Sequence, residues 1–127
     1  MEYGFSKSVD IAFEQAIEKI TGELKKEGFG ILTEIDVRDT LKKKLDVEFK
    51  KYKILGACNP PFAHKALELE ENIGLLLPCN VVVYEKDNKS VVSVFNPLIM
   101  NVFVDNKELS EIAGEVKQKL QNALNRI

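Results

Sequence analysis

Hydrophobic positions that repeat three or four residues apart predict two long amphipathic helices near the ends of the 127-residue chain. We expect the first helix to be capped by Ser8 and to end before Gly28. The second, of about 18 residues by its periodicity, is expected to start with a capping box at Asp105 and Glu108. The apolar stripes are Phe13, Ala16, Ile17, Ile20 and Leu24 in the first helix and Leu109, Ile112, Ala113, Val116, Leu120 and Ala123 in the second.

Between the two helices, apolar runs and alternating patterns predict the strands of a sheet. Asp36 suits the start of a short helix that ends near Leu45, and Asn59, as a capping residue before Pro60, suits the start of another. Pro78 interrupts a long apolar run and predicts a bulge, an edge or a break there. The predicted strands are Glu2 to Ser6, Phe29 to Ile35, Tyr52 to Ala57, Leu75 to Tyr84, Val91 to Phe95 and Met100 to Val104.

This order of elements predicts an α+β fold with helices packed on one face of an antiparallel or mixed sheet. The length fits a single domain over residues 1–127. Hydrophobic residues make up 45% of the chain and charged residues 30%, which indicates a globular rather than a disordered protein. The net charge of -2 argues against a nucleic-acid partner. The longest apolar run, Ile73 to Pro78, is too short to span a membrane, so we expect a cytoplasmic protein.

The segment around Cys58 is the one that suggests chemistry. Cys58 precedes the predicted start of a helix, where the helix dipole could lower the pKa of its thiol and make it a nucleophile. The plainer interpretation is a small buried residue at a strand end. His64, the single histidine, could act as a base toward that thiol or could be an ordinary surface residue. Asn59, as a helix cap, could help to bind a small anion.

Cys79 adds a second thiol, and the two cysteines have no CxxC spacing. If the strands that carry them are neighbours, Cys58, His64 and Cys79 would provide three ligands for a metal such as zinc. The alternative is two unrelated core cysteines. Met100 could join such a site, or pair with His64 as axial haem ligands, although the chain has no CxxCH motif.

Two short elements carry a resemblance to a known family. Cys58-Asn59-Pro60 and Leu77-Pro78-Cys79 lie within longer matching runs, and the sequence resembles the domain-of-unknown-function family numbered 302. The resemblance implies a TATA-binding-protein-like fold with a β-α-β(4)-α arrangement, and homodimers. It implies no DNA binding, because a fold does not carry a function with it. The matching runs are Tyr52 to Pro60, Ala63 to Leu67, Ile73 to Glu85 and Asn96-Pro97.

Three functions follow from these observations. The first is a non-enzymatic, homodimeric binding or interaction module, because the chain contains no complete catalytic set. The second is a thiol or metal site at Cys58, His64 and Cys79. The third is an enzyme that acts on a small anionic metabolite bound at Asn59 and the helix that follows it. Binding of a small molecule is compatible with the first as well as the third.

Overall fold

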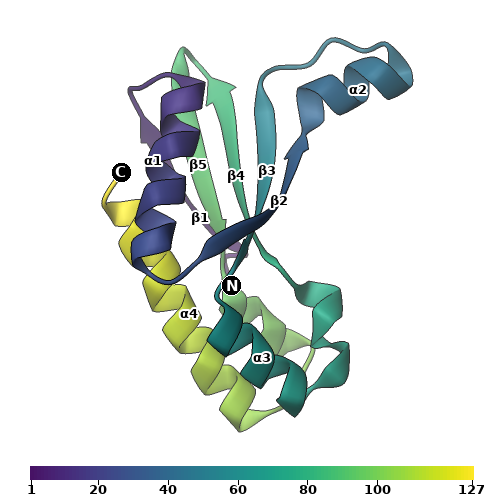
Figure 1. Cartoon of the computed structure of the whole chain (residues 1–127), viewed down its shortest axis with the longest axis vertical. Helices are drawn as coiled ribbons and strands as arrows, with labels where there is room; N and C mark the ends of the chain where they lie inside the picture. The colour runs from purple at the N-terminus through teal and green to yellow at the C-terminus, as the bar shows by residue number, and fades with distance from the viewer.

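The computed structural model describes residues 1–127 and contains one five-stranded sheet in which every neighbouring pair of strands is antiparallel (Figure 1). The order across the sheet is β1-β5-β4-β3-β2. This arrangement confirms the predicted α+β class and selects the antiparallel alternative. The strands are β1 (Gly4–Val9), β2 (Gly30–Asp36), β3 (Tyr52–Cys58), β4 (Cys79–Lys86) and β5 (Lys89–Phe95).

Two long helices, α1 (Phe13–Lys26) and α4 (Lys107–Asn125), cover one face of the sheet (Figure 1). Their predicted apolar stripes face the core, and Ile20, Leu24 and Leu120 are completely buried there. Alternate residues of the central strands point to the same core, as the paired Val81 and Val94 do. Each of these buried aliphatic side chains stabilises the fold by about 1.5–3 kcal/mol, so this layer dominates its stability.

The predicted caps of both long helices are wrong. Ser8 lies in β1, opposite Val91, and α1 begins only after Ala12. At the other helix the capping residue is Asn106, whose side chain accepts a hydrogen bond of 3.0 Å from the backbone N–H of Leu109. The cap is therefore Asn106, one residue after the predicted Asp105.

Two of the predicted strands are wrong in part or in full. Residues 71–76 form a 3-10 helix, η1 (Glu71–Leu76), and β4 starts only at Cys79, after the cis peptide bond between Leu77 and Pro78. Pro78 therefore marks a break before the strand. The segment expected as a last strand from Met100 is largely a second 3-10 helix, η2 (Pro97–Val102).

The remaining helices lie beyond the ends of the sheet (Figure 1). Helix α2 (Val37–Leu45) follows β2 directly, projects from the body and contains no buried residue. Helix α3 (Pro60–Leu69) lies with η1 and η2 at the opposite end, beside the first half of α4. A second, smaller core joins these elements through Ala66, Ile73, Met100 and Leu109. No helix in the chain combines the length and the apolar character that a bilayer crossing requires.

Candidate apolar ligand site

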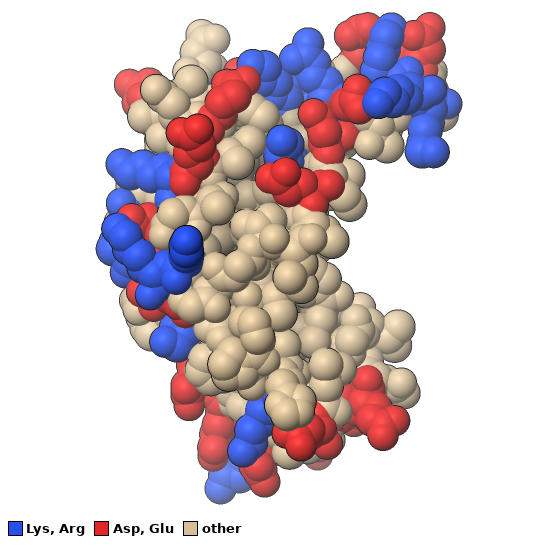
Figure 2. Space-filling model, in the orientation of Figure 1, with Lys and Arg blue, Asp and Glu red and all other residues tan.

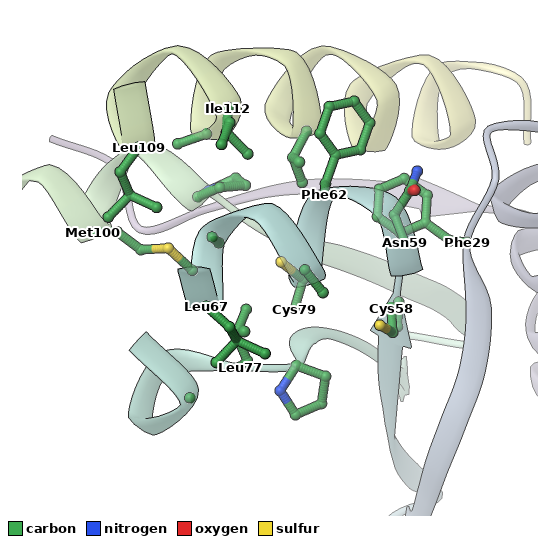
Figure 3. Close-up of a pocket in the computed structure, with 18 of the residues that line it drawn as sticks. Phe29, Cys58, Asn59, Phe62, Leu67, Leu77, Cys79, Met100, Leu109 and Ile112 are labelled. Carbon is green, nitrogen blue, oxygen red and sulfur yellow. The ribbon is translucent and has the colours of Figure 1, made fainter. Parts of the chain in front are cut away.

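A cavity of about 320 Å³ lies where the ends of β3 and β4 meet α3 and α4 (Figure 3). The sheet contributes Ala57 and Cys79, α3 contributes Phe62 and Ala66, and α4 provides much of the opposite wall. Of the 19 lining residues, 15 are hydrophobic and none is charged. The cavity is therefore suited to an uncharged apolar molecule. Its other lining residues are Phe29, Leu32, Cys58, Asn59, Ala63, Leu67, Gly74, Leu77, Pro78, Pro97, Met100, Leu109, Ile112, Ala113 and Val116.

Small side chains on the two helices keep the cavity open. Ala63 and Ala66 lie on α3, and Ala113 lies on α4, at positions where a larger apolar residue would project into the space. Leu32 and Leu67 also line the cavity but are 66% and 40% exposed, which places its mouth beside them. The mouth is thus apolar as well, and an entering molecule meets no polar barrier from these side chains.

Cys58 and Cys79 both line the cavity, so the structure brings the two predicted thiols to one site (Figure 3). Both are free thiols. Burial raises the pKa of Cys79 to about 12, with a smaller contribution from the neighbouring Cys58. Burial also raises the pKa of the Cys58 thiol. At neutral pH both groups are protonated and belong to the apolar wall.

The pKa of the Cys58 thiol is thus raised, whereas a helix dipole acting alone would lower it. The first two positions of α3 are Pro60 and Pro61, which have no backbone N–H to direct at a thiolate. Cys58 instead contacts the apolar cavity, where removal from water disfavours the charged form. A nucleophilic thiolate at Cys58 has no electrostatic support in this structure.

Asn59 is the N-cap residue of α3 by position, but its side chain forms no capping hydrogen bond, contrary to the prediction. Its Nδ2 donates a hydrogen bond of 3.1 Å to the backbone oxygen of Glu27, just after α1. Gly28 makes room for this contact, since a Cβ there would lie 3.0 Å from Nδ2 of Asn59 and the backbone has a φ of +88°. Asn59 is 8% exposed and ties the start of α3 to the end of α1.

His64 lies outside the cavity. Its side chain is 77% exposed and its Nε2 is 3.8 Å from a carboxylate oxygen of Glu68, one turn along α3. No three His, Cys, Asp or Glu side chains form a group that could hold a metal ion. His64 therefore does not join Cys58 and Cys79 at the cavity, because α3 turns the histidine to solvent.

Met100 does line the cavity, yet it has no histidine opposite it. Of the two axial haem ligands that the sequence suggested, Met100 therefore lies in the cavity wall, whereas His64 is exposed to solvent. The residues that form most of the wall were not singled out from the sequence. Alanines such as Ala63 and Ala113 follow the same helical spacing as core residues, and only the spatial arrangement shows that they border a space.

Comparison with known proteins relates the chain to an uncharacterised group. The family model described as "Domain of unknown function DUF302" matches residues 5–127. A crystal structure of an uncharacterized conserved DUF302 protein from Bacillus stearothermophilus is similar, with a TM-score of 0.92 and 28% sequence identity. The match covers 99% of this chain and 98% of that one. No curated protein matches the sequence.

Proposed function

The chain belongs to the family of domain of unknown function DUF302, and we propose that it is a non-enzymatic, homodimeric module that binds an uncharged apolar small molecule. The observation that carries this proposal is the cavity between the sheet end, α3 and α4. Its volume of about 320 Å³ falls at the lower end of the range for small-molecule sites, which is roughly 300–1,000 Å³. Its wall offers burial of apolar surface, the main source of affinity for such a molecule.

The composition of the wall also argues for the neutral character of the ligand. No lining residue is charged, and the one lining amide, Asn59, already donates to Glu27. A carboxylate or phosphate placed there would lose its hydration without gaining a cationic partner. The enzyme on a small anionic metabolite, which the sequence left open, is therefore the weakest of the three functions.

Of the three residues predicted to form a thiol or metal site, Cys58 and Cys79 line the same cavity and His64 does not. Their raised pKa values argue against a reactive thiolate, and a zinc site would need further ligands that the neighbourhood lacks. We therefore assign both thiols to the binding surface for the ligand. Two free thiols are also compatible with a reducing compartment, which supports the proposed cytoplasmic location.

The proposed homodimer is supported by surfaces that no part of the same chain covers. The second face of the sheet bears exposed residues on several strands, among them Ser6, Ile35 and Asn80. Ile35 is 48% exposed, and α2 buries none of its residues. The TATA-binding-protein-like fold implied by the sequence resemblance stays a prediction, and no nucleic-acid function is proposed from it.

Binding of two matched probes would test the cavity. We expect 1-octanol to shift the amide resonances of lining residues such as Ala63 and Ala113 in a heteronuclear NMR titration. Octanoate at pH 7.5, with the same chain length, should bind at least roughly tenfold more weakly because its carboxylate finds no cationic partner in the wall. Equal affinity for the alcohol and the carboxylate would contradict the proposed neutral ligand.

Variants that fill the space give the second part of the test. Ala113→Leu and Ala63→Leu place larger side chains in the cavity from opposite walls, and each should reduce octanol binding. Gln118→Leu adds a leucine on the exposed side of α4 and serves as the matched control. If octanol binding survives both cavity variants, the molecule binds elsewhere and the proposal fails.

A further inference from the structure

The segment that projects from the body, residues 37–51, is called the arm here. It consists of α2 and the residues that lead to β3, and none of the α2 residues is buried. Three apolar side chains near its far end, Leu45, Val47 and Phe49, are 66%, 45% and 40% exposed. A helix of nine residues is marginal in water on its own, so its stability depends on packing. The arm thus has the character of an element that packs against another molecule.

The arm borders a hollow on one side of the molecule, which Figure 2 shows between the projecting part and the opposite end. In Figure 1 the same side is bordered by β2 and by α3 with η1. These bordering elements also carry exposed apolar residues: Leu32 and Ile35 on β2, Leu67 on α3 and Leu75 on η1. Leu32 and Leu67 are the residues at the mouth of the cavity. The hollow is therefore continuous with the proposed ligand site.

Charge differs in sign between the two ends of this hollow. The arm contains six basic and three acidic residues. Residues 64–71 and 105–115, at the other end, contain seven acidic and two basic residues together; we call them the acidic end. Within the arm Lys42 and Lys43 already form ion pairs, whereas Lys44 forms none, and neither Glu70 nor Glu71 forms one at the acidic end.

We propose that the arm of one copy docks in the hollow of a second copy, with its basic residues toward the partner's acidic end. In a twofold dimer each arm pairs with the acidic end of the other copy, because each copy supplies one arm and one acidic end. The chain is complementary to itself in this respect, which favours a second copy over an unrelated partner. The apolar residues of the docked arm then cover the mouth beside Leu32 and Leu67.

This inference rests on the homodimer in the proposed function and adds a role for it, since each cavity is closed by the other copy. It predicts that dimer formation and ligand retention are linked. Ligand should leave the monomer faster than the dimer, because only the dimer covers the apolar mouth.

A charge-swap experiment tests the arm. Variant one, Arg38→Glu/Lys44→Glu, makes the arm acidic, and variant two, Glu68→Lys/Glu70→Lys/Glu71→Lys, makes the acidic end basic. Each variant alone should dimerise at least tenfold more weakly than the wild type, because like charges then meet at both contacts. A mixture of the two should form a mixed dimer, because both of its contacts pair opposite charges. Analytical ultracentrifugation, with a mass tag on one variant, distinguishes the mixed dimer from either homodimer.

Lys19→Glu/Lys25→Glu on α1 is the control, since it changes the net charge as much as variant one and should leave the dimer intact. Circular dichroism checks that every variant is folded. Wild-type protein that stays monomeric at high concentration, variants that dimerise as tightly as the wild type, or variants that fail to pair on mixing would each overturn the arm exchange. The experiment contains no ligand, so its failure is separate from a failure of octanol binding, which would count against the cavity alone.

Discussion

Burial of Cys79 in the cavity wall makes the stability of the fold depend on pH in the alkaline range. The side chain is 6% exposed, and its thiol pKa is raised to about 12 by that burial. The unfolded chain exposes the same thiol with a pKa of about 8.5–9. As the pH rises above that value, the unfolded state loses its proton first, while the folded state keeps it. The stabilisation by the neutral thiol is therefore complete below about pH 8.5 and is lost progressively toward pH 12.

The magnitude follows from the difference between the two pKa values. Between pH 7.5 and 9.5 the unfolded thiol ionises and the folded one does not, so the free energy of unfolding should fall by about 1 kcal/mol from Cys79. Cys58 adds to this fall in the same direction, because burial raises its pKa too. Urea denaturation in the presence of a reductant measures the change at both pH values. Because the chain contains no tryptophan, far-UV circular dichroism is the suitable signal.

The informative comparison is between pH dependences and not between absolute stabilities. Cys79→Ala should remove about 1 kcal/mol of the fall between pH 7.5 and 9.5, whatever its effect on stability at pH 7.5. Cys58→Ala should remove a smaller part, since that side chain is half-buried. If Cys79→Ala keeps the full pH dependence of the wild type, the thiol is not held neutral by the cavity wall and the argument is refuted.

Two further changes test the local structure by urea denaturation. Asn106→Ala removes the side chain that caps α4, which should lower the free energy of unfolding by about 1 kcal/mol, and an unchanged value would show that the cap is dispensable. Gly56→Ala places a Cβ against Thr33 and 2.8 Å from Pro78, so it should destabilise by about 1–3 kcal/mol. Gly30→Ala, where a Cβ meets open space, is its control, and equal effects of the two glycine substitutions would contradict this reading of the crowding at Gly56.

The two long helices, α1 and α4, were predicted correctly because an apolar stripe that repeats every three or four residues must face a core. Their capping residues were predicted wrongly, since a cap depends on where the preceding segment ends. Ser8 is drawn into the sheet by pairing with Val91, which moves the start of α1 to Phe13. The apolar run after Pro97 forms η2, because Asn96 accepts a hydrogen bond from the N–H of Leu98 and bends the chain.

The candidate site was predictable only where residue types are chemically distinctive. Cys58, Asn59, Cys79 and Met100 drew attention as thiols, an amide and a thioether, and all four line the cavity. The sequence left Cys58 open between an activated thiolate and a buried residue, because the sign of a pKa shift depends on the surroundings in space and not on the neighbours in sequence. His64 was a candidate because histidine is a common base and metal ligand. Which face of the short helix carries it depends on the residue at which α3 begins and on how α3 packs, and the sequence does not define these.

The position of the cavity follows from the length of α4. The second half of this helix packs on the sheet through Val116, Leu120 and Leu124, whereas Leu109 in its first half packs on α3, η1 and η2. No strand continues under that first half, so two separate cores meet along one helix. The cavity lies at their junction, next to Ala113.

A core under selection for stability alone would fill this junction, because unfilled space forfeits dispersion contacts. Ala113→Leu should therefore raise the free energy of unfolding by about 0.5–2 kcal/mol while it reduces octanol binding. Such opposite effects would mean that stability is given up for a binding site. A variant that loses stability as well as binding would instead show that Ala113 is already tightly packed, and the cavity would then be too small at that wall to hold a ligand.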